Sequence, residues 1–154
     1  MKRNIFTVIL LFSFSLIAFA NESKAIRVTP PAPKFTDAER QAELAKRRAT
    51  VLEKMSPNSI LIVWSATPRN YAGDVDFMFR QENNHFYLTS LKQVNSTLVL
   101  VKGATGNSEY LFLPKRNPQF ETWNGKMYSN EEATRISGVK TIIDSSELTT
   151  FITK

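Results

Sequence analysis

DFMFRQENNHFYLTS, which runs from Asp76 to Ser90, is the most informative stretch of this sequence. It places Arg80 and Gln81 between two aromatic clusters and contains His85, the only histidine of the chain. Because aromatic residues favour strands, the segment that starts at His85 predicts an aromatic strand. The polar residues among these aromatics either form an active site or hold the fold together.

The residues before this stretch predict a helix and a strand. Thr36-Asp37-Ala38-Glu39 is a capping box, which predicts an amphipathic helix over about residues 36–55. Ile60 to Trp64 is a short apolar run without alternation, which predicts a strand covered on both faces. The apolar face of the helix contains five residues, among them an arginine whose stem can lie on apolar surface: Leu44, Arg48, Val51, Leu52 and Met55.

The residues after the stretch complete an α/β pattern. Thr97 to Val101 and Tyr110 to Leu113 are apolar runs separated by a glycine-containing turn, which predicts an antiparallel hairpin. A second capping box at 129–132 opens a short helix that Gly138 ends, and residues 139–143 return as a strand. The sequence therefore predicts a mixed β-sheet flanked by helices.

The end of the chain predicts one more helix. Asp144-Ser145-Ser146 is a suitable helix start, with Leu148, Phe151 and Ile152 on one face. Since the chain stops at Lys154 after barely two turns, we expect the domain to be C-terminally incomplete.

The first residues are typical of a secretory signal peptide over residues 1–20. Two cations precede an apolar run from Ile5 to Ala18, and Ala18-Phe19-Ala20 is an A-x-A cleavage site. We expect cleavage near Ala20 and export, either to a periplasm or out of the cell. An uncleaved N-terminal anchor is the alternative, which the short apolar run disfavours because a bilayer span needs about 20 residues.

Composition limits the rest of the chain to one domain. With 154 residues and 42% hydrophobic residues, the chain can form one globular core. The proline-containing residues 21–34 predict a linker, and residues 35–154 the domain. The chain has no cysteine, so neither disulfides nor thiolate metal sites support an exported form.

The formal charge of +6 is modest. Nucleic-acid binding would rest on charge alone, and export argues against it; the cations concerned are Lys46, Arg47, Arg48, Lys115 and Arg116.

No group of residues in the sequence forms a complete catalytic site. One histidine cannot supply H-E-x-x-H or a two-histidine zinc site. Asp74, Asp76 and Glu82 are the acids for an all-carboxylate metal site, but their spacing matches no known ligand loop. A G-x-S-x-G motif, a phosphate-binding glycine loop and a Cys-His pair are absent. We therefore expect neither catalytic nor metal-ligating residues in this chain.

Single residues of the central stretch still have candidate roles. His85 is either a general base or, more commonly for such a residue, a packed or capping histidine. Arg80 lies among aromatics, where an unpaired guanidinium is costly to bury, so we expect a structural ion pair with Asp74, Asp76 or Glu82. Ligand binding is the alternative for Arg80. Asp74 lies in a loop and is the acid best placed for a functional role.

A second group of candidates is E-T-W-N-G-K, Glu121 to Lys126. Trp123 in this polar loop is either a lid over the domain's own core or an anchor for a partner or substrate. The sequence leaves both open.

These features resemble the N-terminal domain of the aminopeptidase P, or Xaa-Pro aminopeptidase, family. The resemblance rests on D-x-x-F-x-F-R-Q-x-x-x-x-F-Y-L-T from Asp74 to Thr89, on E-x-W-x-G from Glu121, and on the order of the predicted elements. It covers about residues 35–150. The first motif also identifies three structural residues: Arg80, Gln81 and Tyr87.

The resemblance implies a mixed-sheet α/β domain ahead of a separate pita-bread catalytic domain. Enzymes of this family remove an N-terminal residue that precedes proline, with two metal ions, usually manganese, held by catalytic-domain residues. The resemblance also implies a homo-oligomer built by the N-terminal domain. It places Trp123 near the substrate pocket of a neighbouring subunit and Asp74 near the mouth of the active site.

Two positions depart from the family pattern. Ser90 stands where glycine is common, which puts the tight turn after the predicted strand in question. His85 stands where an aromatic residue is usual, so the resemblance gives it no catalytic role.

Two functions are compatible with these features. The first is the assembly and substrate-gating domain of an exported Xaa-Pro metalloaminopeptidase, inactive without its catalytic domain and with hydrophobic surface left uncovered where that domain docks. The second is a stand-alone exported binding domain that holds proline-containing peptides, or a protein partner, at the Trp123 loop without cleavage.

Overall fold

The computed structural model describes residues 31–32 and 34–153. The predicted signal peptide lies outside the described residues, as does most of the predicted linker. Within the described part, no helix has the length and apolar character that a membrane span requires. The elements in chain order are α2 (Asp37–Lys54), β1 (Ser59–Trp64), β2 (Asn70–Ala72), β3 (Val75–Asp76), α3 (Asn83–Thr89), β4 (Thr97–Lys102), β5 (Asn107–Leu113), α4 (Pro118–Asn124), α5 (Asn130–Ser137), β6 (Thr141–Asp144), the 3-10 turn η1 (Ser145–Glu147) and α6 (Leu148–Ile152).

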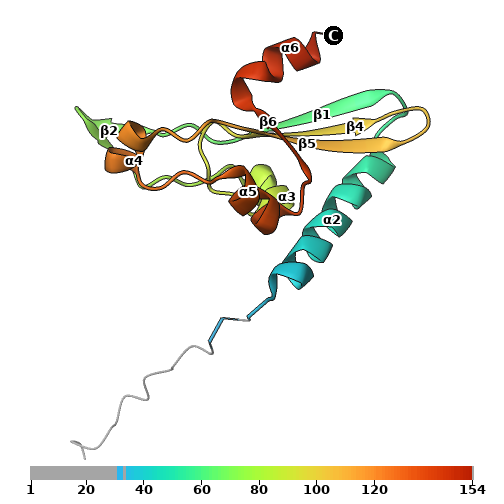
Figure 1. Cartoon of the computed structure of the whole chain (residues 1–154), viewed down its shortest axis with the longest axis horizontal. Coiled ribbons are helices and arrows are strands. Elements are labelled where there is room, and N and C mark those ends of the chain that lie inside the picture. Colours follow the sequence, from blue (N-terminus) through green and yellow to red (C-terminus); the bar gives the residue numbers. More distant parts are fainter. Residues whose placement is uncertain (1–30, 33, 154) are drawn as a thin grey trace, which may run out of the picture. The chain divides into compact units, whose positions relative to one another are not determined.

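The main sheet contains four strands in the order β1-β4-β5-β6 (Figure 1). β4 and β5 form the predicted antiparallel hairpin, with Leu98 opposite Leu111, and β1 pairs antiparallel with β4. β6 pairs parallel with β5, so the sheet is mixed as predicted. β2 and β3 form a separate two-stranded hairpin.

Apolar side chains cover the two faces of the main sheet unequally. One face, which includes Leu98 and Leu111, belongs to the larger core cluster together with residues of α2, α3 and α5. The opposite face, with Val99 and Phe112, packs against Leu148 of α6. Successive side chains of a strand point to opposite faces, which places Leu98 and Val99 in different layers. Figure 1 shows α6 on the other side of the sheet from α3 and α5.

The α6 face of the sheet is thinly covered. Because α6 has five residues, it does not reach along β1, where Ile60 and Trp64 keep 46% and 55% of their surface exposed. The prediction that this strand is covered on both faces is therefore wrong. The predicted apolar face of the last helix holds for Leu148 and Phe151, which join the second core cluster, whereas Ile152 is exposed.

The predicted helix caps are confirmed. Glu39 N donates to Thr36 Oγ1 at 3.2 Å and Thr36 N donates to Glu39 Oε2 at 2.8 Å, which completes the first capping box. Ser129 and Glu132 make the same reciprocal pair at the start of α5. Gly138 ends α5 in a left-handed conformation with φ of 76°, which glycine adopts without steric cost.

Arg48 of α2 is buried and joins four elements. Its Nε donates to Glu109 Oε2 of β5 at 2.8 Å, and its Nη1 donates to the carbonyl oxygens of Leu88 and Ser137, each at 3.0 Å. Those carbonyls lie in the last turns of α3 and α5, where the helix dipole places partial negative charge. The guanidinium therefore holds two helix ends against the sheet, and its burial removes it from the cationic surface considered for nucleic acid.

The segment after Glu82 is a helix, so the prediction of an aromatic strand is wrong. Glu82 caps α3 by accepting from His85 N at 2.7 Å, and Ser90 ends the helix in a left-handed conformation with φ of 57°. A helix of seven residues is too short to be stable in isolation. Buried contacts, including those of His85 and Leu88, hold it in place. The positive φ explains why glycine suits the Ser90 position, and the turn forms with serine as well.

Candidate functional site

Gln81 is a buried structural residue at the centre of the FRQ motif. Its Oε1 accepts from Ala66 N at 2.7 Å and from Glu82 N at 2.9 Å. Its Nε2 donates to the carbonyl oxygens of Leu91 and Gln93 at 3.3 and 3.0 Å. The side-chain amide thus joins the chain after β1, the start of α3 and the segment that follows α3. It has no polar group left over for a ligand.

His85 is fully buried and makes polar contacts on both ring nitrogens. Nε2 lies 3.2 Å from Ser96 Oγ and Nδ1 lies 3.3 Å from Thr89 Oγ1. Each hydroxyl also contacts a backbone carbonyl, Ser96 Oγ that of Gln93 and Thr89 Oγ1 that of His85, so which ring nitrogen of the neutral imidazole donates depends on the tautomer. Desolvation lowers the pKa of His85 to about 4, against the opposing charge of Glu82. The geometry is that of a packed histidine.

Burial of His85 predicts a pH-dependent stability. In the unfolded chain the imidazole has its ordinary pKa near 6.5, so as pH falls the unfolded state takes up a proton before the folded state does. Between pH 7 and pH 5 we expect the free energy of unfolding to decrease by about 2 kcal/mol. Urea unfolding at three pH values measures this decrease.

The control for this prediction is His85→Asn, which removes the titrating group. Because the chain has one histidine, no other side chain of ordinary pKa titrates between pH 5 and 7. The variant should be less stable at pH 7 and should lose much less stability across this range, the remaining loss coming from carboxyl groups whose pKa is lowered on folding, such as Glu121. Parallel pH profiles for the two proteins would contradict the assignment of the slope to His85.

Arg80 does not form the predicted ion pair. Its side chain is exposed, and its one side-chain hydrogen bond within the described residues is a long one, 3.4 Å, from Nη2 to Asn83 Oδ1. Within the described residues no carboxylate of Asp74, Asp76 or Glu82 pairs with it. The premise that aromatic neighbours bury Arg80 was wrong, because several of them are themselves exposed.

Tyr87 is the third residue that the motif identifies, and it lies on the exposed side of α3. The Arg47 guanidinium lies 4.3 Å from the centre of the Tyr87 ring, and Arg47 Nη1 donates to the Tyr87 carbonyl at 3.0 Å. Arg47 also pairs with Glu43, so this cation is engaged within the domain. The contact ties α2 to α3.

Asp74 lies in the turn of the β2–β3 hairpin. Asn70 Nδ2 holds this turn by donating to the carbonyl oxygens of Gly73 and Val75 at 2.9 and 3.1 Å. Asp74 is exposed in this turn. The hairpin continues into an aromatic pair, because the ring of Tyr71 packs edge-on against Phe77 at 5.0 Å.

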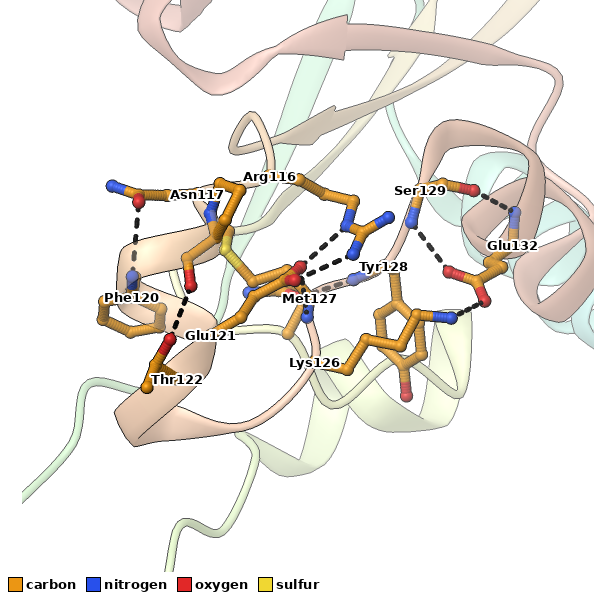
Figure 2. A network of polar contacts seen from close by, with 12 residues as sticks. Arg116, Asn117, Phe120, Glu121, Thr122, Lys126, Met127, Tyr128, Ser129 and Glu132 are labelled. Atoms are coloured by element: carbon orange, nitrogen blue, oxygen red, sulfur yellow. Dashed lines mark hydrogen bonds and ion pairs between the residues drawn. The ribbon is translucent and has the colours of Figure 1, made fainter.

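Glu121 fixes α4, the short helix that carries Trp123. Figure 2 shows its carboxylate between the Arg116 guanidinium and the backbone of Met127. Arg116 makes two hydrogen bonds to it, at 2.7 and 2.8 Å, and Met127 N donates to Glu121 Oε1 at 3.1 Å. These contacts, led by the side-chain bond from Arg116, lower the pKa of Glu121 to about 2. The chain before and after α4 is therefore tied to one carboxylate.

Trp123 projects into solvent from this fixed helix. Its exposed fraction is 86%, so the alternative of a lid over the domain's own core is excluded. The helix ends at Asn124. Gly125 follows with φ of 85°, and the Gly125 N–H donates to the Glu121 carbonyl. The second alternative, an anchor for a partner or a substrate, stays a prediction.

The elements that carry Asp74 and Trp123 lie at the same end of the main sheet (Figure 1). A cleft of about 250 Å³ separates the segment after the β2–β3 hairpin from α4, with Phe77 and Phe79 on one side and Phe120 on the other. Asp74 and Trp123 do not line this cleft themselves. The structure thus brings together their elements and leaves Gln81 and His85 in the interior.

The described residues do not fit a metal centre. Within residues 34–153 no group of three or more His, Asp or Glu side chains is positioned to hold an ion. Glu82, one of the three acids of the carboxylate alternative, has both carboxylate oxygens engaged at the start of α3, because Oε2 accepts from His85 N and Oε1 accepts from Asn84 Nδ2. The metal expected for the family therefore has no ligand set in the described part of this chain.

Sequence reasoning missed α4, which positions Trp123. Asn117 caps it by accepting from Gln119 N and Phe120 N, and Pro118 occupies the first helical position. Asn-Pro followed by a terminal glycine is a recognisable pattern for a short helix. That pattern was present at Asn117-Pro118 and Gly125.

Comparison with known proteins settles the family. Residues 44–154 match the family described as Aminopeptidase P, N-terminal domain. This chain belongs to that family. The Xaa-Pro aminopeptidase of Haemophilus influenzae is 32% identical over 112 residues, which are 73% of this chain and 26% of that protein. Human Xaa-Pro aminopeptidase 3 is 28% identical over 117 residues, 73% of this chain and 23% of that protein.

A solved structure supports the same aminopeptidase P assignment. Escherichia coli aminopeptidase P superposes with a TM-score of 0.68 and 25% identity, covering 78% of this chain and 27% of that chain. The predicted family and the predicted fold class, a mixed sheet flanked by helices, are confirmed. This aminopeptidase P N-terminal domain spans about a quarter of the length of these relatives.

Proposed function

We propose that this chain is the assembly and substrate-gating domain of an exported, manganese-dependent Xaa-Pro aminopeptidase, and that it has no peptidase activity alone. Family membership and the larger size of the relatives support this proposal. The relatives are named for cleavage of Xaa-Pro bonds, and one Escherichia coli structure contains the inhibitor Pro-Leu. Substrate, metal and assembly state are carried over to this chain as proposals.

Trp123 is the observation that carries the gating role. Its indole is exposed while its helix is fixed through Glu121, Arg116 and Met127. An aromatic side chain that is exposed on a rigid support loses little entropy on binding, and this suits an anchor at an interface. We assign Trp123 to contact with a substrate or with a neighbouring subunit.

The thinly covered α6 face supports docking of a second domain. Ile60, Trp64 and Ile152 are large apolar residues that remain exposed on or beside it. Exposed apolar patches of this kind commonly mark the surface where a partner docks. We assign this face to contact with the catalytic domain.

Export is a separate part of the proposal and has its own test. Residues 1–20 have the pattern of a signal peptide, with a cleavage site at Ala18-Phe19-Ala20. N-terminal sequencing of the mature protein recovered from outside the cytoplasm should begin at Asn21. Recovery of an intact Met1 terminus would contradict export with cleavage.

An assay of Xaa-Pro dipeptide hydrolysis tests the proposal directly. We expect the purified chain to show no turnover with added Mn²⁺, because the described residues hold no metal ligand set. Size-exclusion chromatography of the same sample should show self-association through the exposed apolar surfaces. Turnover that a chelator abolishes would contradict the absence of a catalytic site.

A stand-alone peptide-binding domain is the second candidate, favoured by the cleft beside α4. Two tryptophans, Trp64 and Trp123, allow each to be followed alone. In a Trp64→Phe variant, a proline-containing peptide should change the fluorescence of Trp123 under this second hypothesis. Under the first it should not, because there the peptide binds only together with the catalytic domain. In the control variant Trp123→Phe, the remaining tryptophan fluorescence comes from Trp64.

A further inference from the structure

A second cavity lies beside Phe77, on the surface of segment 77–83. Its volume is about 420 Å³, which is within the range of small-molecule sites. Arg69 and Arg80 both line it, with Phe77, Met78 and Phe79 between them along the chain. We call it the Arg69–Arg80 pocket.

The two arginines of the Arg69–Arg80 pocket are unusual within this domain. Neither forms an ion pair among the described residues. Arg80 has only the long bond to Asn83 Oδ1, and Arg69 lies over the Phe77 ring at 5.3 Å. All other arginines of the described part pair with a carboxylate: Arg40, Arg47, Arg48, Arg116 and Arg135.

The one acid that lines the pocket is already occupied. Glu82 Oε1 accepts from Asn84 Nδ2 at 3.1 Å and Oε2 accepts from His85 N at 2.7 Å. Burial acts to raise the pKa of Glu82, but these hydrogen bonds outweigh it and the pKa is lowered, so the group stays ionised. Two guanidinium groups and one carboxylate leave a single net positive charge at the pocket.

The side chains that line the Arg69–Arg80 pocket indicate which chemical groups a ligand would carry. Phe77 and Met78 expose 48% and 97% of their surfaces, so an apolar group can bury against them. A guanidinium presents a planar pair of donors that matches a carboxylate, and its stacking on Phe77 orients Arg69 in advance. A pocket with a single net positive charge matches a singly charged anion, such as a carboxylate, better than a phosphate.

We propose that the Arg69–Arg80 pocket binds a carboxylate that carries an apolar group, either a free acid or the C-terminal residue of a peptide. The carboxylate is held by Arg69 and Arg80, and the apolar group lies against Phe77 and Met78. This proposal requires only residues of this chain and does not depend on peptidase activity.

Calorimetric titration with N-acetyl-phenylalanine and with its amide tests the proposal. The two probes differ only in the carboxylate, and we expect the acid to bind at least tenfold more tightly. Arg80→Gln and Arg69→Gln should each weaken binding of the acid about tenfold, since each removes one charged hydrogen-bonding pair. Lys46→Gln removes one cation from the exposed side of α2 and should leave the affinity unchanged.

Further probes separate the possible sources of the ligand. N-acetyl-alanyl-phenylalanine should bind as tightly as the free acid, or more tightly, if the natural ligand is a peptide end. Equal affinity for acid and amide, unchanged affinity in Arg80→Gln with an unchanged melting temperature, or tighter binding of inorganic phosphate would each overturn the proposal.

Discussion

Arg48→Met is expected to decrease the free energy of unfolding by about 3–5 kcal/mol, as removal of one partner from a buried ion pair does. Methionine fills similar apolar space but donates no hydrogen bond. The substitution would leave the Leu88 and Ser137 carbonyls buried without their donor, and Glu109 without its cation. Urea denaturation followed by circular dichroism measures the change.

The control for Arg48 lies two residues earlier on the same helix. Lys46 is exposed, and Lys46→Met should change stability by no more than about 0.5 kcal/mol. Glu109→Gln keeps an acceptor for Arg48 and should have an intermediate effect. A loss below about 1 kcal/mol in Arg48→Met would show that the carbonyls find other partners, because an unsatisfied buried group costs about 1–3 kcal/mol.

Gln81→Leu is the second large effect, and we expect it to destabilise the domain by about 3 kcal/mol or more. Leucine preserves approximate size but loses the four hydrogen bonds to Ala66, Glu82, Leu91 and Gln93. Two backbone N–H groups and two carbonyls would then lack their partners. Thermal and urea unfolding both measure the loss.

The adjacent residue provides the comparison. Arg80→Gln changes a neighbour in the same motif whose side chain is exposed, so its stability should stay within about 0.5 kcal/mol of the unmodified chain. If Gln81→Leu proved as mild as Arg80→Gln, the amide network would not be the structural centre of the motif.

Local signals in the sequence predicted the elements that depend on local contacts. The two capping boxes and Gly138 mark helix ends through bonds that span three or four residues. The hairpin of β4 and β5 follows from two apolar runs around a short turn. In each case the residues that stabilise the element are also those that signal it.

α3 shows why other elements could not be predicted in this way. Its sequence, Asn83 to Thr89, favours a strand by composition, yet the segment is helical because distant residues hold it. Arg48 of α2 donates to the Leu88 carbonyl near the end of α3, and Ser96, the residue before β4, contacts His85. The tertiary environment overrides a weak local preference.

The candidate site was predicted only in part for the same reason. The resemblance identified Gln81 and Tyr87 as structural residues, and the structure gives each a defined contact. The pairing of Arg80 depended on where Asp74 and Asp76 would lie in space, which spacing does not reveal. The exposure of Trp123 likewise depends on how Glu121 and Arg116 direct α4.

The mixed pairing of the main sheet has a consequence for the order of folding. β4 and β5 are joined by a turn of four residues, so their contacts close a small loop. The parallel strand β6 is separated from β5 in the sequence by α4 and α5, so pairing β6 with β5 closes a much longer loop. Because loop closure costs entropy before contacts form, the hairpin should assemble early and β6 should join last. Until then one edge of β5 offers unpaired backbone groups, and this is the period in which newly made chains are most prone to associate with one another.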